Sequence, residues 1–274
     1  MARLVEEHAS EWNRRFVVEV DGGARVEAVL YRGDSLCVST QVGCAVGCPF
    51  CASGANGLTR PLSLDELIGQ VEAVRSQASF DRVTLSGVGE PLHCPGTLAF
   101  IAWCRRERLA PSVTTSGGPI EKLRDLLRAP HNGITVSVHA GTEATRARAV
   151  PRGPSLEALF AALTEELPRM SRSRRKKVAV AYLVIRDLND ASDELDAFAA
   201  RAEPLGLRTH LYAYNPVPTS AHQPVGRASY EAAYERLRAR GLNVRMSSQA
   251  RVEANGGCGT LVAVRPRRDA AILA

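Results

Sequence analysis

Long hydrophobic runs are missing from this 274-residue sequence, and their absence excludes two classes of protein. A membrane-spanning helix needs about 18 or more consecutive apolar residues, and no such run occurs. The first residues, Met-Ala-Arg-Leu-Val-Glu-Glu-His, also lack the apolar stretch of a secretory signal peptide. The sequence therefore predicts a cytoplasmic protein that is neither secreted nor bound to a membrane.

Internal repeats and low-complexity linkers are absent as well, so a single globular unit accounts for the chain. Hydrophobic residues make up 45% and charged residues 23% of the sequence, as in ordinary globular proteins. A domain of this length buries roughly 70–75% of its unfolded surface, so its core needs no disulfides. The seven cysteines therefore indicate a reducing compartment rather than a disulfide framework.

The charge balance is mildly basic. Thirty-five Lys and Arg against 29 Asp and Glu give a net charge of +6 and a pI near 9.1. Such a balance suits a polyanionic partner such as RNA, although Arg-rich and Ala-rich proteins commonly have a high pI without one. Two basic segments, residues 172–177 and the tail with Arg265, Arg267 and Arg268, are either phosphate contacts or solvated surface.

Three closely spaced cysteines are the most informative feature. Cys44, Cys48 and Cys51 form a C-x3-C-x2-C pattern, with Phe50 before the last cysteine. A structural zinc site usually draws its four ligands from two such pairs, and no matching second pair occurs. Three thiolates on a [4Fe–4S] cluster would leave one iron open to another ligand. The pattern favours this cluster over zinc, and it resembles the motif of the radical S-adenosylmethionine (SAM) superfamily, whose cofactor chelates the open iron.

Hydrophobic periodicity predicts alternating strands and helices. Residues 16–20 and 25–31 flank Asp21-Gly22-Gly23 and indicate a β-hairpin. Ser63-Leu64-Asp65-Glu66 is a capping box at the start of a helix. Strands are expected at 36–40, 82–86, 111–115, 134–139, 178–184, 208–213 and 243–247. Helices are expected at 64–76, 96–108, 119–128, 155–167, 191–203 and 229–240.

Repeated strand–helix units predict a parallel sheet with crossover helices. The fold class is therefore α/β, a radical SAM partial (β/α)6 TIM-like barrel with a small amino-terminal β-hairpin extension. The expected division is 1–35 for the extension, 36–264 for the barrel and 265–274 for a basic tail. In such barrels the chemistry lies at the carboxyl ends of the strands.

Several polar motifs fall at these strand ends. Gly87-Val88-Gly89-Glu90-Pro91 follows a strand, and a carboxylate there can accept hydrogen bonds from the ammonium group of a methionine-derived cofactor. Thr114-Thr115-Ser116-Gly117, Ser137-Val138-His139 and Tyr214-Asn215-Pro216 also end strands. Each motif alone is typical of a turn or cap, whereas together they indicate the mouth of a nucleoside-binding site.

The four other cysteines differ in context. Cys104 lies in an apolar helix and is expected to pack in the core, while Cys94 has no motif around it. Cys37 ends a strand that leads into the site. Cys258 lies in the glycine-rich run 255–261, as suits a thiol that must visit two positions.

Taken in order, these motifs resemble the radical SAM adenine methylases of the RlmN/Cfr family, which act on ribosomal and transfer RNA. The resemblance rests on 37–44, the cluster loop, Gly89-Glu90-Pro91, Ser137-Val138-His139-Ala140, Asn215-Pro216 and Cys258-Gly259, and it extends from about residue 16 to about 264. It implies two SAM molecules per turnover. One methylates Cys258, and the other yields a 5′-deoxyadenosyl radical that activates this methyl group for addition to the electron-poor carbon 2 of adenine. Cys37 would then remove the ring proton and form a disulfide with Cys258.

The resemblance also implies the partners of the reaction. An external one-electron donor of the flavodoxin or ferredoxin type would reduce the cluster. The residues implied to contact the cofactor are Gly89, Glu90, Thr114, Ser137, Val138, His139 and Asn215.

The regions that read the substrate depart from the family pattern. Only 36 residues precede Cys37, where the RNA methylases carry a longer region with a helical accessory domain. Residues 247–257 also lack the family's arginine–glycine–aspartate pattern before Cys258. Three hypotheses remain: an adenine methylase of RNA, a biosynthetic methylase of a small heteroaromatic, nucleoside or peptide, and a non-enzymatic iron–sulfur or zinc protein that binds RNA. Cys37 and Cys258 argue against the third, because a binding module needs neither.

Overall fold

One ten-stranded sheet organises the molecule. A computed structural model describes residues 2–253, 257 and 259–263. The sheet runs in the order β1-β2-β3-β4-β7-β8-β9-β10-β11-β12, and every neighbouring pair from β4 to β12 is parallel. Its strands are β1 (Arg3–Ala9), β2 (Asn13–Glu19), β3 (Arg25–Tyr31), β4 (Ser35–Val38), β7 (Arg82–Leu85), β8 (Ala110–Thr115), β9 (Gly133–Ser137), β10 (Val178–Val184), β11 (Arg208–Ala213) and β12 (Asn243–Met246).

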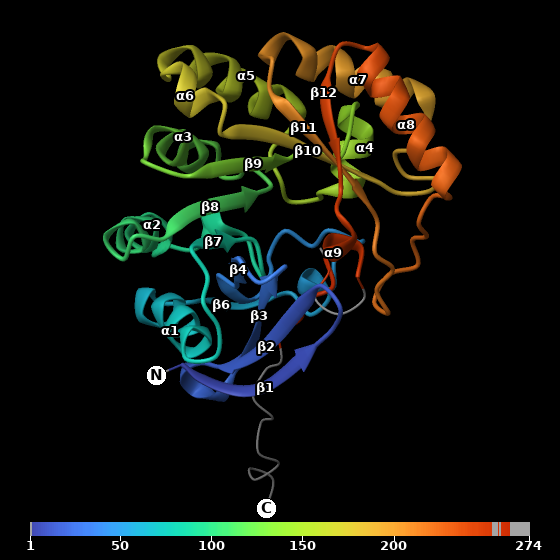
Figure 1. The fold of residues 1–274 in the computed structure, drawn as a ribbon. Coiled ribbons are helices and arrows are strands. Elements are labelled where there is room, and N and C mark those ends of the chain that lie inside the picture. The colour runs from blue at the N-terminus through green and yellow to red at the C-terminus, as the bar shows by residue number, and fades with distance from the viewer. Residues whose placement is uncertain (1, 254–256, 258, 264–274) are drawn as a thin grey trace, which may run out of the picture.

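Helices connect the parallel strands and cover one side of the curved sheet (Figure 1). The six crossover helices are α1 (Leu64–Arg75), α2 (Thr97–Arg106), α3 (Ile120–Arg128), α5 (Leu156–Glu166), α7 (Ser192–Ala202) and α8 (Arg227–Ala239). Shorter helices are α4 (Glu143–Ala149), α6 (Arg172–Arg175) and α9 (Gln249–Val252). Because β1 and β12 lie at opposite edges of an open sheet, the predicted partial (β/α)6 barrel is confirmed. Among the described residues, no helix is long and apolar enough to cross a membrane.

The start of α1 shows how local sequence sets these elements. The Ser63 hydroxyl accepts the Glu66 N–H at 3.2 Å, and the Glu66 carboxylate accepts the Ser63 N–H at 2.8 Å. This is the capping box that the sequence predicts. Leu67, Val71 and Val74 then follow at helical spacing and are fully buried against the sheet.

The amino-terminal strands extend the barrel sheet. The predicted hairpin is β2 paired with β3, and β1 adds an edge strand that the sequence analysis missed. β3 also pairs antiparallel with β4, so the extension continues directly into the barrel. The boundary at residue 35 stays a prediction, and the predicted tail 265–274 lies outside the described residues.

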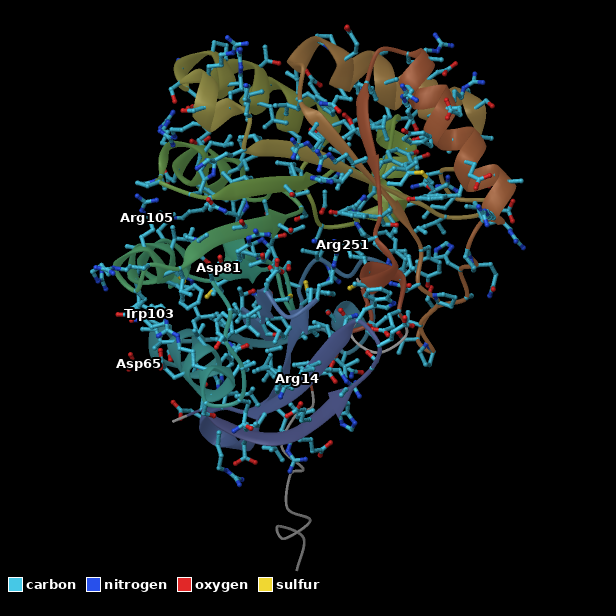
Figure 2. All side chains as sticks on the ribbon, viewed as in Figure 1. Arg14, Asp65, Asp81, Trp103, Arg105 and Arg251 are labelled. Atoms are coloured by element: carbon cyan, nitrogen blue, oxygen red, sulfur yellow. The ribbon has the colours of Figure 1, made fainter. Side chains whose placement is uncertain are left out.

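The carboxyl-terminal segment returns to these amino-terminal strands. Asn13 Nδ2 donates to the Ala250 carbonyl at 2.6 Å, and the Ser10 hydroxyl donates to the Glu253 carboxylate at 2.7 Å. Farther along, the Val262 N–H donates to the Glu27 carboxylate at 2.8 Å. Figure 2 shows Arg251 near the middle of the molecule, between the barrel strands and the amino-terminal sheet.

Candidate active site

The three cysteines of the motif lie in a loop between two short strands. β5 (Gln41–Gly43) and β6 (Leu58–Pro61) pair antiparallel and close the ends of this loop. Within it the Cys51 N–H donates to the Cys48 carbonyl at 3.1 Å, and the Ala52 N–H donates to the Gly259 carbonyl at 2.9 Å. The loop is therefore held both by its own turn and by the carboxyl-terminal segment.

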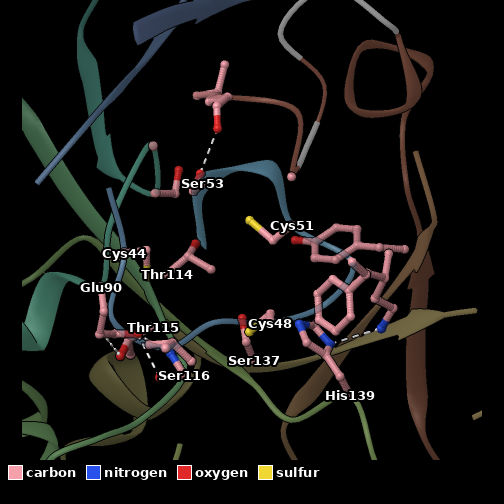
Figure 3. Close-up of a pocket in the computed structure, with 18 of the residues that line it drawn as sticks. Cys44, Cys48, Cys51, Ser53, Glu90, Thr114, Thr115, Ser116, Ser137 and His139 are labelled. Atoms are coloured by element: carbon pink, nitrogen blue, oxygen red, sulfur yellow. Dashed lines mark hydrogen bonds between the residues drawn. The ribbon is translucent and has the colours of Figure 1, made fainter. Parts of the chain in front are cut away.

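All three cysteines line one cavity at the carboxyl ends of the parallel strands. Figure 3 shows Cys48, Cys51, Thr114 and His139 arranged around the same open space. The predicted site residues in the cavity wall are Cys44, Cys48, Cys51, Gly89, Glu90, Thr114, Ser137 and His139. The fold therefore brings together motifs that are up to 95 residues apart in the chain (44 to 139).

Buried apolar side chains back the cysteine loop. Val46 and Phe50 pack with Val150, Ile185 and Tyr214 in a cluster that the three cysteines contact. Burial raises the pKa of the Cys44 thiol to about 11 and raises that of Cys48 well above its usual value. Thiols in such surroundings become thiolates when a metal binds them, because the cation compensates the buried charge.

A buried arginine lies beside this loop. The Arg146 guanidinium donates to the carbonyls of Ser116 at 2.7 Å, Ser137 at 2.8 Å and Val138 at 2.7 Å. Burial lowers the pKa of Arg146 to about 10, so the side chain stays charged at neutral pH, and Cys48 is its leading electrostatic partner. Arg146 thus ties the ends of β8 and β9 together and places positive charge beside the cysteines.

The Glu90 carboxylate organises the part of the cavity wall that follows β8. The carboxylate accepts the Ser116 N–H at 2.8 Å, the Ser116 hydroxyl at 2.7 Å and the Leu92 N–H at 3.1 Å. The Thr115 hydroxyl donates to it as well. Glu90 therefore already fixes the turn after β8, in addition to lining the cavity where the sequence places a cofactor contact.

The glycines before Glu90 are required by the neighbouring backbone. A Cβ at Gly87 would lie 2.8 Å from the Ser39 nitrogen, and one at Gly89 would lie 2.6 Å from the Gln41 Cβ. Gly89 also has a φ of +107°, which other residues rarely adopt. Close packing against the segment after β4 therefore explains both glycines, apart from the cofactor contact that the resemblance implies for Gly89.

His139 is a neutral hydrogen-bond donor at the cavity wall. Its Nδ1 accepts the Leu183 N–H at 3.0 Å, which leaves the ring proton on Nε2. Burial, reinforced by Arg146, lowers the pKa of His139 to about 3. The ring packs edge-on against Phe50 with centroids 5.7 Å apart, so its orientation is fixed from both sides.

Two predicted cofactor contacts lie behind the wall. Val138 is fully buried in the main core, and its carbonyl accepts from Arg146. Asn215 Nδ2 donates to the Arg251 carbonyl at 2.7 Å, so this side chain holds the carboxyl-terminal segment. Their direct contact with the cofactor stays a prediction.

The two further cysteines differ in what the structure describes. Cys37 is buried on β4, and its sulfur lies 3.1 Å from the hydroxyl oxygen of Ser86, which lines the cavity. Cys258 lies outside the described residues, while Gly257 and Gly259 line the same cavity as the three motif cysteines. Cys104 is buried in the core as predicted, and Cys94 is buried with its thiol donating to the Leu62 carbonyl.

Sequence reasoning missed Arg146 as a site residue, whereas it placed the motif that contains Tyr214 at the mouth of the site. Tyr214 lines the cavity, and its hydroxyl is buried without a hydrogen-bond partner among the described residues. A buried polar atom of this kind calls for a ligand or water. Its position directly before Asn215 was a usable signal, whereas nothing in the sequence around Arg146 marked it.

Comparison with known proteins identifies the family. The sequence profile described as "Radical SAM superfamily" matches residues 38–199, more than half of the chain. The chain belongs to the radical SAM superfamily. It is 33% identical to a probable RNA methyltransferase of Aromatoleum aromaticum and 32% identical to one of Leptothrix cholodnii, covering 95% of this chain and 75% and 76% of those proteins.

A solved structure gives the same assignment. The crystal structure of a radical SAM methyltransferase from Sphaerobacter thermophilus superposes with a TM-score of 0.83 at 28% identity, covering 95% of this chain and 81% of that one. The chain is therefore a radical SAM methyltransferase, and this family works with a [4Fe–4S] cluster and SAM.

The residues of the cavity fit these two groups. Three soft thiols face one space, as a cubane cluster with one open iron requires. No three His, Cys, Asp or Glu side chains in the described part of the chain meet closely enough to hold a single metal ion, whereas a cluster presents its irons at separate corners. The orphaned Tyr214 hydroxyl offers a further polar contact for a bound group.

Proposed function

We propose that this enzyme methylates carbon 2 of an adenine in RNA, with Cys258 carrying the methyl group and Cys37 resolving the covalent adduct. The observation that carries the proposal is the position of Cys37. Its sulfur lies next to the Ser86 hydroxyl, and Ser86 lines the cavity that the motif cysteines share. Gly257 and Gly259, the chain neighbours of Cys258, belong to the same wall. The RNA substrate is supported by relatives that are named probable RNA methyltransferases.

Each part of the cavity wall has a role in holding the cofactors. Cys44, Cys48 and Cys51 would ligate the cluster, and Glu90 with the Thr114 and Ser137 hydroxyls would hold the amino-acid and ribose groups of SAM. When bound, the cluster and SAM supply the methyl groups and the carbon-radical chemistry. The apolar residues behind the loop keep water from the cysteines.

The two remaining cysteines perform the transfer. Carbon 2 of adenine is electron-poor, so it does not attack a sulfonium methyl group directly. The Cys258 thiolate would accept the methyl group first. Once this methyl group has lost one hydrogen atom, which the radical chemistry of the second SAM would take up, its carbon would bond to carbon 2 of the ring; the linked ring would lose one electron, which the cluster would accept, and its carbon 2 proton, which Cys37 would accept. The Cys37 thiolate would then attack the Cys258 sulfur, so that a disulfide forms, the sulfur–carbon bond breaks and the released carbon takes up a proton to become the methyl group of the product.

A mass measurement tests the carrier role. After expression and anaerobic purification, the peptide that contains Cys258 should be heavier by the mass of CH2, because a methyl group replaces the hydrogen of the thiol. Cys258→Ala should abolish methyl transfer, while Cys94→Ala, which alters a buried thiol outside the cavity, should retain it. Full methylation by Cys258→Ala would contradict the proposed mechanism.

A nucleoside analysis tests the substrate. RNA is incubated with the reconstituted enzyme, SAM and a flavodoxin or ferredoxin reducing system, then digested to nucleosides. We expect a new methyladenosine that depends on both Cys37 and Cys258. Methylation of free adenosine without any methylation of RNA would instead favour the biosynthetic alternative.

A further inference from the structure

A second hollow of about 390 Å³ opens beside the reaction cavity. The two spaces share three lining residues, Tyr31, Ser86 and Arg251. Ser86 is the residue whose hydroxyl contacts the Cys37 sulfur at 3.1 Å. A molecule in the second hollow would therefore lie next to the resolving cysteine of the proposed mechanism.

The lining of this hollow is basic and rich in hydroxyl groups. Three arginines, Arg32, Arg82 and Arg251, face a single acidic residue, Asp34. The hydroxyl-bearing residues in its wall are Tyr31, Ser35, Thr84, Ser86 and Ser248. Guanidinium and hydroxyl groups are the side-chain donors that phosphate oxygens usually accept from.

The carboxylates near Arg82 form only weak, exposed ion pairs with it. Arg82 lies 3.5 Å from the Asp34 carboxylate, and both side chains are 56% exposed. Its other acidic neighbour, Asp81, is 3.7 Å away and 78% exposed. Exposed pairs of this kind are worth about 0–1 kcal/mol, so a phosphate can replace the carboxylates at little cost.

Arg251 forms the boundary between the two hollows. Its guanidinium lies over the Tyr31 ring at 5.5 Å and over the Tyr212 ring at 5.4 Å. Figure 2 shows this residue between the barrel strands and the amino-terminal sheet. Planar groups stacked in this way offer the surface on which proteins stack an unpaired base.

We propose that the second hollow binds the phosphodiester next to the target nucleotide of a single-stranded RNA segment. Arg32 and Arg82 would contact the phosphate, and the target base would pass Arg251 toward Ser86 and Cys37. The proposal rests on the function proposed above and narrows its substrate class to a nucleic acid strand, since a free nucleoside carries no phosphate for the arginines to bind.

Binding of a fluorescein-labelled, single-stranded 12-mer oligoribonucleotide tests this assignment. Its anisotropy is measured at several KCl concentrations with the wild type, with Arg32→Gln/Arg82→Gln and with Arg105→Gln/Arg106→Gln, an equal loss of charge at the exposed end of α2. Loss of both contacts to this one phosphate should weaken binding about 10- to 100-fold and reduce the slope of log K against log salt by about 0.7. Arg32→Lys/Arg82→Lys should restore most of the binding.

Three results would overturn the proposal. Equal losses in the two Gln variants would mean that only net charge matters, and no loss in Arg32→Gln/Arg82→Gln would mean that the hollow holds no phosphate. Competition by AMP as strong as that by unlabelled oligonucleotide would assign the hollow to a mononucleotide. Methylation of Cys258 in the wild type is measured in parallel: its absence would contradict the proposed function, whereas its presence together with RNA binding that is unchanged in Arg32→Gln/Arg82→Gln would contradict only the phosphate site.

Discussion

At the scale of single residues, the contact between Cys37 and Ser86 links the sheet to the proposed chemistry. Cys37 lies in β4, and Ser86 directly follows β7, the parallel strand that pairs with β4. The Ser86 hydroxyl lies 3.1 Å from the sulfur, close enough to orient the thiol and to stabilise its thiolate. Ser86 would thus be a positioning residue for the step that we propose for Cys37.

Ser86→Ala should slow resolution of the covalent adduct. One hydrogen bond to a charged group is worth about 1.5–3 kcal/mol, so we expect turnover to fall about tenfold or more while methylation of Cys258 persists. Quenched-flow samples analysed by mass spectrometry should show accumulation of protein-linked RNA. Ser76→Ala, at the exposed end of α1, provides the control, and an unchanged adduct level in Ser86→Ala would remove this role.

Arg146 shows how a residue without any motif can hold a site together. Four carbonyls accept from its guanidinium, those of Ser116, Ser137, Val138 and Pro154. Each buried carbonyl that loses its donor costs about 1–3 kcal/mol. The segments that carry Ser116 and Ser137 therefore depend on one side chain.

Arg146→Met should be strongly destabilising. We expect the free energy of unfolding to fall by about 3 kcal/mol or more, a large part of the 5–15 kcal/mol of a typical domain. Arg146→Lys keeps the charge but not the planar fork, so it should recover only part of the loss. Urea unfolding of the two variants measures both effects, and a fully stable Arg146→Met would contradict this account.

At the scale of elements, the amino-terminal sheet positions the segment that contains Cys258. Contacts from Ser10 and Asn13 hold the chain before this cysteine, and Glu27 holds it afterwards through the Val262 N–H. Glu27 is buried and is also paired with Arg15 at 2.8 Å. Burial raises the pKa of Glu27, whereas the Val262 N–H and Arg15 act to lower it.

Glu27→Ala should release the end of this segment. The loss of a charge-assisted hydrogen bond, about 1.5–3 kcal/mol, should accelerate hydrogen exchange of the Val262 amide roughly tenfold to hundredfold. Glu19→Ala, which removes a half-exposed carboxylate paired with Arg3 on the same sheet, should leave that amide unchanged. Equal protection of Val262 in both variants would mean that other contacts hold the segment.

Most elements could be predicted from sequence because their burial follows simple periods. The seven parallel strands, β4 and β7 to β12, and the six crossover helices lie within two residues of their expected ends. β1 escaped prediction because it is an edge strand with mostly exposed residues, so no alternation of polar and apolar side chains marks it. β5 and β6 are too short to show a period.

The site was predictable only where chemistry fixes spacing within a few residues. The cysteine motif and the strand-end positions of Glu90 and His139 could be read locally, and the cavity wall contains them. Arg146 and Arg251 act through contacts with distant carbonyls and rings, which no local pattern encodes. Asn215 was placed correctly at a strand end, but its partner is a carbonyl of α9.

At the scale of the whole molecule, three histidines make stability depend on pH: the buried His131 and His139 and the half-buried His210. Burial, reinforced by Arg174, Lys177 and Arg105, lowers the pKa of His131 to about 4. Burial with Arg251, Arg208 and Arg245 lowers that of His210 to about 4 as well. In the unfolded chain a histidine becomes protonated near pH 6.5. Between about pH 6.5 and 4 the unfolded chain therefore binds protons at these histidines that the folded chain does not bind.

Acid should therefore destabilise the fold before its carboxylates titrate. Each of the three histidines should lower the free energy of unfolding by about 1 kcal/mol per pH unit below pH 6.5, and the effect should vanish above it. Both ring nitrogens of His131 are buried without a hydrogen-bond partner among the described residues. His131→Leu therefore removes a group that can bind a proton, and it breaks no hydrogen bond between this ring and those residues.

His131→Leu should flatten this pH dependence by about a third, since it removes one of three such histidines. Urea unfolding of the cluster-free protein at pH 7.5, 6.5, 5.5 and 5.0 measures the slope, with His8→Gln on the exposed edge strand β1 as the matched loss of a histidine. His8→Gln should keep the slope of the wild type. An equal slope in His131→Leu would show that His131 is not among the groups that couple protons to folding, and the acid sensitivity would then have to come from His139, His210 and the carboxylates.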